Sequence, residues 1–155
     1  MADMQVIIFG IADERYGVRV QQVQSIERLL PITRVPKTLP FIRGVMNLRG
    51  VITPVLDVRE RFGFATQEAT DETRVIVVQV EDILVGLIVD AVMDVATIDE
   101  ALVEAPPAVV GGVQAEYLHG IARVAEEALI LLNLAKILSD VEEKQLLEVE
   151  KSVRG

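Results

Sequence analysis

The chain consists of two similar halves, and this internal repeat limits its fold more than any other feature of the sequence. At an offset of 69 residues, Val6–Phe9 aligns with Val75–Val78, and Tyr16–Val20 aligns with Val85–Val89. Each half therefore has an apolar segment, a polar turn and a second apolar segment with glycine at its second position. The repeat predicts two structurally equivalent units.

The later parts of the two halves align at a different offset. Phe41–Val45 falls on Tyr117–Ile121 at an offset of 76, so the second half holds seven extra residues. Proline and glycine at Ala105–Pro107 and Gly111–Gly112 mark a loop, where we place the extra residues. Glycines recur in the same frames of both halves, which argues against a chance match of apolar residues.

Each half has about five short apolar segments separated by turns, a pattern typical of a small β-barrel or sandwich. The chain is 51% apolar but only 4% aromatic, and a core of valine and isoleucine favours strands. We expect strands near residues 5–11, 15–20, 26–35, 45–48 and 51–56, and near 74–80, 83–89, 92–98, 118–125 and 128–132.

We therefore predict an all-β fold, with a first barrel over about 15–66 plus the N-terminal strand and a second over about 74–138. A barrel of about sixty residues buries too little surface to be stable alone. We expect the two barrels to share a hydrophobic interface, with a groove at their junction.

Turn and cap residues add local expectations. Asn47–Ile52 predicts a tight hairpin in which Gly50 supplies a positive φ. Asp57 and Asn133 are good N-cap residues for the short helical stretches that follow them. Ser139–Glu142 fits a capping box, which predicts a C-terminal helix over about 139–153.

The sequence offers no set of side chains that converges on a reaction. The chain has no cysteine, and His119 is its only histidine, which excludes disulfides, thiolate metal sites and histidine pairs. Adjacent carboxylates such as Asp71–Glu72 lie at predicted turns, where solvent exposure explains them. Phosphate-binding glycine motifs are absent too. We expect no catalytic, cofactor-binding or metal-binding residues.

The charge and hydropathy of the chain narrow its partners. Acidic residues number 24 against 15 basic ones, whereas nucleic-acid binding rests on lysine and arginine. The longest nearly pure apolar stretch, Ile83–Val89, is too short to span a bilayer, and the N-terminus lacks the pattern of a secretion signal. We expect a cytoplasmic protein with no nucleic-acid partner and no direct membrane insertion.

The run Phe41–Arg59, with Asn47-Leu48-Arg49-Gly50 at its centre, resembles the signature of the bacterial chemotaxis coupling (adaptor) proteins, the CheW family. Tyr16–Val18, Val85–Val92 and Tyr117–Ile121 are similar to further motifs of that family. The resemblance extends from about Gln5 to Leu138, which is nearly the whole chain.

The resemblance implies two SH3-like five-stranded barrels around a hydrophobic layer. It also implies a non-enzymatic scaffold that couples the cytoplasmic tips of chemoreceptors to the regulatory domain of the histidine kinase CheA, at membrane-bound receptor arrays. We expect one barrel end to stack against the kinase domain and the helical receptor tip to lie in or beside the groove.

By the same resemblance, the partner-binding residues are Arg49, Gly50, Gly44, Asn47, Leu48, Val23, Ser25 and Ile26. Arg49 matches the family's functional arginine, and at an exposed turn its guanidinium can pair with carboxylates of a partner. Gly44 and Gly50 also fit a purely conformational role, and Val23 and Ile26 fit core packing equally well. The family commonly has glutamate where this chain has Ser25.

Two other functions are open at this point. A generic SH3-like peptide-binding module, unrelated to chemotaxis, would usually display an aromatic-lined groove, and this chain has only four phenylalanines and two tyrosines. An enzyme would need a polar cleft with shifted titratable groups. Co-purification with a receptor fragment and the kinase domain separates the three hypotheses.

Overall fold

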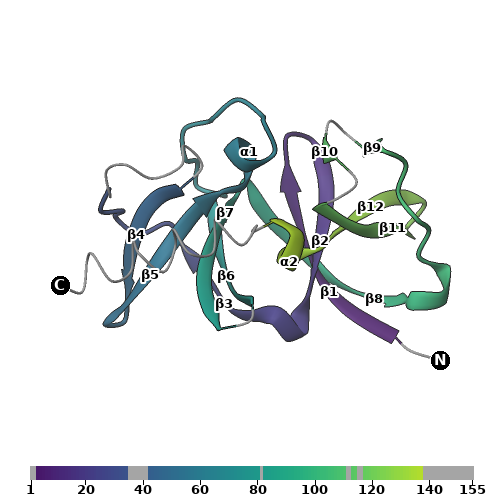
Figure 1. The fold of residues 1–155 in the computed structure, drawn as a ribbon, viewed down its shortest axis with the longest axis horizontal. Coiled ribbons are helices and arrows are strands. Elements are labelled where there is room, and N and C mark those ends of the chain that lie inside the picture. The colour runs from purple at the N-terminus through teal and green to yellow at the C-terminus, as the bar shows by residue number, and fades with distance from the viewer. Residues whose placement is uncertain (1–2, 35–41, 81, 111–112, 115–116, 138–155) are drawn as a thin grey trace.

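The strands of the computed structural model form two five-stranded sheets whose strand orders are equivalent under the repeat (Figure 1). The structure describes residues 3–34, 42–80, 82–110, 113–114 and 117–137. One sheet has the order β11-β12-β2-β1-β8, and the other has β4-β5-β7-β6-β3. The expected all-β fold of two SH3-like five-stranded barrels is confirmed.

The first sheet, here called the terminal barrel, is drawn from both ends of the described chain. Its strands are β1 (Asp3–Ile11), β2 (Glu14–Arg19), β8 (Ala91–Asp99), β11 (Leu118–Val124) and β12 (Glu127–Leu132). The short helix α2 (Leu134–Ile137) follows β12. Between β8 and β11 lie a 3₁₀ turn, Glu100–Leu102, and the small hairpin of β9 (Val109–Val110) and β10 (Val113–Gln114), in the region expected to hold the extra residues.

The second sheet, here called the inserted barrel, is one continuous segment. Its strands are β3 (Val23–Arg28), β4 (Ile42–Leu48), β5 (Val51–Asp57), β6 (Arg74–Val80) and β7 (Ile83–Val89), and helix α1 (Val58–Arg61) follows β5. The chain enters this barrel through a 3₁₀ turn, Val20–Gln22, and leaves it through Asp90.

This division differs from the expected barrels over about 15–66 and 74–138. The hairpin β1–β2 pairs with β8 and β12 of the second half, and the hairpin β6–β7 pairs with β3 and β5 of the first half. The hairpins of the two repeats have thus exchanged places. Because both hairpins have nearly the same apolar pattern, either one fits either sheet, and the local pattern does not show which sheet it joins.

One strand boundary was also wrong. We expected the third strand over 26–35, but β3 spans Val23–Arg28, and Thr33 forms only an isolated bridge with Val45. Pro31 explains the early end, because proline has no N–H to donate to a sheet ladder. The predicted C-terminal helix over 139–153 lies outside the described residues.

Strands β1 and β6 are apolar on both faces because each face packs in a different cluster. In β1, Val6 and Ile8 belong to a cluster inside the terminal barrel, whereas Ile7 and Phe9 belong to a larger cluster between the barrels. The inserted barrel has its own interior cluster around Val75 and Val77. Alternating side chains of one strand therefore serve two cores.

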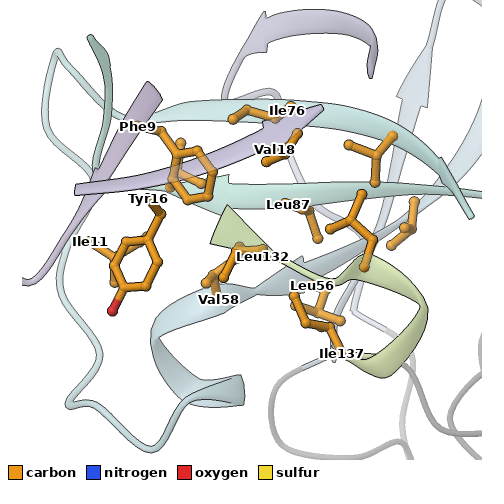
Figure 2. Packing of buried hydrophobic residues seen from close by; sticks show 14 of the residues in the cluster. Phe9, Ile11, Tyr16, Val18, Leu56, Val58, Ile76, Leu87, Leu132 and Ile137 are labelled. Atoms are coloured by element: carbon orange, nitrogen blue, oxygen red, sulfur yellow. The ribbon is translucent and has the colours of Figure 1, made fainter. Parts of the chain in front are cut away.

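The cluster between the barrels, here called the seam, confirms the predicted shared apolar layer. Figure 2 shows Val18 and Leu132 of the terminal barrel packed among Ile76, Leu87 and Leu56 of the inserted barrel. All five side chains are at most 5% exposed.

The recurring glycines are explained by the barrel interiors. An added Cβ at Gly17 would lie 3.1 Å from Leu131 Cδ2, and one at Gly86 would lie 2.7 Å from Val75 Cγ1. In both sheets the second strand of the hairpin pairs in parallel at this glycine, with Leu131 in one and Val55 in the other. The repeat therefore keeps glycine where the interior leaves no room for a side chain.

Candidate partner-binding surface

The β4–β5 turn presents the central part of the family-like motif. Arg49 has φ 50° and Gly50 has φ 87°, which suits the two-residue turns that match the twist of a hairpin. The side-chain oxygen of Asn47 accepts a hydrogen bond of 2.8 Å from the amide of Gly50. The predicted positive φ of Gly50 is confirmed, and Asn47 holds the turn that carries Arg49.

Arg49 pairs with Glu27 of strand β3 across the open side of the inserted barrel. Its two terminal nitrogens donate to the two carboxylate oxygens of Glu27 at 3.2 and 3.1 Å. Hydrogen bonds from Arg49 and Ser25 lower the pKa of Glu27. The hydrogen bond to Glu27 and its negative charge raise the pKa of Arg49. The Arg49 side chain is still 70% exposed, and such surface pairs contribute little to stability, so a partner can reach the guanidinium.

Glu27 is the residue that sequence reasoning missed. Ser25 and Glu27 are two residues apart on β3, so their side chains lie on the same face of the strand. Glu27 supplies a carboxylate to Arg49. The strand period places Glu27 on the same face as Ser25, but it gives no sign that this face meets Arg49.

Two apolar residues of the edge strands extend the seam to the surface. Ile26 is 41% exposed and lies opposite Ile76 of the seam. Its repeat equivalent on the terminal barrel, Val95, is 57% exposed and lies opposite Ile7 of the seam. Paired residues share a face of a sheet, so both side chains stand on seam-facing surfaces.

The remaining candidates have mainly internal contacts. Val23 is partly buried against the seam, and Leu48, 7% exposed, belongs to the interior cluster of the inserted barrel. Gly44 is buried at an irregularity of the β4–β5 ladder, with φ 141°, and a Cβ there would lie 2.1 Å from the carbonyl oxygen of Thr33. The structure thus brings Arg49, Gly50, Asn47 and Ser25 together, places Ile26 on the seam-facing side, and puts Leu48 and Gly44 in the packing beneath.

A groove adjoins the crossover from the terminal to the inserted barrel. It encloses about 440 Å³ and is lined by polar residues of β1 and β8, including Gln5 and Thr97, together with Val20 and Gln21. On the same rim, Nη2 of Arg19 lies 3.6 Å from Oε1 of Glu100 and 3.4 Å from Nε2 of the exposed His119. In the described part of the chain, no group of three or more histidine or acidic side chains could hold a metal ion.

None of the helices in the described part of the chain is long and apolar enough to cross a membrane.

Comparison with known proteins gives one consistent result. The family model of the CheW-like domain matches residues 5–142. The chemotaxis protein CheW of Bacillus subtilis is 41% identical over 143 residues, covering 91% of this chain and 90% of that protein. The chemotaxis protein CheW of Klebsiella aerogenes is 36% identical over 146 residues, covering 94% and 88%.

A solved structure agrees in fold as well as sequence. The crystal structure of the scaffolding protein TtCheW from Thermoanaerobacter tengcongensis superposes with a TM-score of 0.85 at 33% identity, covering 95% of this chain and 94% of that one. With the duplicated barrels, the shared seam and the Arg49 turn, these matches show that the chain belongs to the CheW-like family of chemotaxis scaffold proteins.

Proposed function

We propose that this protein couples chemoreceptors to the histidine kinase CheA, as a scaffold that makes and breaks no covalent bond. The observation that carries the proposal is the Arg49 turn, where a 70% exposed arginine side chain stands on a tight turn that the Asn47–Gly50 hydrogen bond closes. A fixed turn loses little conformational entropy on binding, and guanidinium is well suited to carboxylate partners.

The two partners would use different surfaces. The helical tip of a chemoreceptor would lie in or beside the junction of the barrels, where Ile26 and Val95 offer exposed apolar contacts from opposite barrels. The regulatory domain of CheA would stack on a barrel end, where Val51, 44% exposed, adjoins the Arg49 turn. The complex would form in the cytoplasm at membrane-bound receptor arrays.

The aromatic residues weigh against a generic peptide-binding module. Phe9 and Tyr16 are fully buried, and Phe62 is 7% exposed. They pack with one another in the seam, and do not line an open groove of the kind that binds proline-rich peptides. The scaffold function is therefore the better supported of the two.

The test is co-purification of the protein with a chemoreceptor fragment and the regulatory domain of CheA, using wild type, Arg49→Glu and the control Arg123→Glu. Arg123 is exposed on β11 of the other barrel. We expect Arg49→Glu to weaken binding about tenfold or more, with a melting temperature close to wild type, because exposed ion pairs contribute little to stability. Arg123→Glu should bind normally. Wild type that captures neither partner would refute the proposal, and unfolding of Arg49→Glu would make Arg49 structural.

A further inference from the structure

A row of aromatic rings joins the two barrels beside α1. Phe62, the residue that follows α1 in the inserted barrel, packs between two tyrosines of the terminal barrel. Its ring centroid lies 5.8 Å from that of Tyr16 and 6.0 Å from that of Tyr117. Phe9 continues the row, 5.9 Å from Tyr16. Phe62 therefore closes one side of the seam from the opposite barrel.

Two arginines of α1 reach across the same boundary. Arg59 donates to both carboxylate oxygens of Asp90, at 2.8 and 2.6 Å. The Asp90 carboxylate also accepts from the amide of Ala12, in the β1–β2 turn, at 3.0 Å. Arg61 donates to the carbonyl oxygen of Ile137 at 2.8 Å and to the hydroxyl of Tyr117 at 3.1 Å. The short helix, which follows β5 and packs beside β7 of its own barrel, is thus also tied to the terminal barrel, through Arg61 directly and through the Asp90 carboxylate that Arg59 and the amide of Ala12 share.

One buried group opposes this closed arrangement. The hydroxyl of Tyr16 is buried and has no hydrogen-bond partner among the described residues. Burial, with the nearby charge of Glu14, raises the pKa of Tyr16 to about 12. In Figure 2 the oxygen points away from the centre of the seam cluster, toward its edge. An unpaired buried hydroxyl destabilises the state that buries it, and separation of Phe62 from Tyr16 would give that hydroxyl access to water.

Within the described residues, the repeat equivalent of α1 lacks both arginines. At the positions of Arg59 and Arg61, helix α2 has Ala135 and Ile137. Ala135 has no polar side chain that could reach across the seam. The contacts of α1 are therefore not required by the barrel fold as such, because the equivalent helix lacks them.

We propose that α1 with Phe62 is a latch that leaves the seam and returns while both barrels stay folded. Arg59 and Arg61 hold the latch closed, and the unpaired Tyr16 hydroxyl favours opening. An undocked helix of four residues does not persist in water, so opening also breaks its internal hydrogen bonds. In the closed state the amide of Phe62 donates to the carbonyl oxygen of Val58 at 3.0 Å, and the amide of Phe64 donates to the carbonyl oxygen of Arg59 at 2.7 Å. The latch does not depend on the proposed partners.

Hydrogen exchange of the full chain tests the latch, with the amides of residues 62–64 as reporters and those of β6 and β7 as the reference. Asp90→Asn removes the charge that holds Arg59 and should speed exchange at the reporters about tenfold, which corresponds to about 1.4 kcal/mol. Tyr16→Phe removes the unpaired hydroxyl and should slow it by a similar factor. The reference amides exchange only on global unfolding, so in wild type and in both variants they should stay better protected than the reporters and depend more steeply on denaturant concentration.

Asp94→Asn is the matched control, because among the described residues the exposed Asp94 side chain is hydrogen-bonded to the following amide, at 2.8 Å, and to no group of α1. It should leave the reporters unchanged. The proposal is overturned if the reporters have the same protection and the same denaturant dependence as the strands, since α1 would then open only on global unfolding. An equal effect of Asp94→Asn, or no slowing in Tyr16→Phe, would also overturn it. If Asp90→Asn does not fold, the Tyr16→Phe result decides alone.

Discussion

Substitution of Gly86 with alanine is expected to destabilise the protein through a single contact in the inserted barrel. The new Cβ would lie 2.7 Å from Val75 Cγ1 and 3.5 Å from Val55 Cγ1. Carbon atoms pack best at about 3.5 to 4.0 Å, so the contact with Val55 is ordinary and that with Val75 is too short. Val75 is fully buried and β-branched, and such a side chain has few alternative rotamers.

The size of the effect follows from two opposing terms. Overfilling a packed core costs about 1 to 3 kcal/mol, whereas replacing glycine with alanine stabilises by about 0.4 to 1 kcal/mol through the unfolded chain. The net loss in the free energy of unfolding is therefore about 1 to 2 kcal/mol. For a chain of this length, that lowers the melting temperature by about 2 to 8 °C.

Chemical denaturation and thermal melting of three variants check this reasoning. Gly17→Ala, at the equivalent position of the repeat, should lose less stability. Its new Cβ would lie 3.1 Å from Cδ2 of Leu131, the end of a flexible side chain that can move away. Val75→Ala in the Gly86→Ala background makes room for the added methyl group, so a double-mutant cycle should show favourable coupling above about 0.5 kcal/mol. A Gly86→Ala protein as stable as wild type, or purely additive losses, would refute the packing argument.

Three further substitutions test other parts of the fold. Gly44→Ala should lower the free energy of unfolding, measured by denaturation, by about 3 kcal/mol or more. The reason is that the new Cβ would lie 2.1 Å from the carbonyl oxygen of Thr33. A smaller loss would show that the backbone can shift. Leu87→Ala, at a 2% exposed seam position, should cost about 2 to 5 kcal/mol by the same assay. Burial acts to raise the pKa of Asp90, but hydrogen bonds from Arg59 and Ala12 and the charge of Arg59 lower it below 3.8. The stability that comes from this lowered pKa is lost as the pH falls from about 4 through the pKa of the folded state. The difference in denaturation midpoint between wild type and Asp90→Asn should therefore narrow over that pH range. A difference that stays constant would contradict the lowered pKa of Asp90.

The repeat made much of the fold predictable, because it fixes which residues are equivalent before any strand is paired. The repeat placed Gly17 and Gly86 at equivalent positions. The turn at Gly50 was predicted from the residues of the turn itself. Pairing partners were not predictable in this way. The hairpins β1–β2 and β6–β7 have the same apolar period, and only the tertiary structure shows that each joins strands of the other half.

The site shows the same limit for side chains distant in sequence. The exposed turn of Arg49 was predicted from local residues, and its φ follows the same turn geometry. Glu27 was missed because it lies 22 residues from Arg49 and becomes its neighbour only when the barrel closes. Arg59 and Asp90, 31 residues apart, meet because they follow the parallel neighbours β5 and β7, in which Asp57 pairs with Ile88. Charge pairs across a sheet opening depend on curvature, which periodicity does not report.

The insertion of one barrel within the other has a consequence for synthesis on the ribosome. The inserted barrel consists of consecutive strands, so it can assemble soon after β7 emerges. The hairpin β1–β2 is made first, yet its sheet is complete only when β12 has been translated, and the face that packs inside the terminal barrel stays uncovered until then. Because nascent exposed strands favour aggregation, we expect slow translation between β7 and β12 to lower the yield of folded protein more than an equal delay within β3–β7.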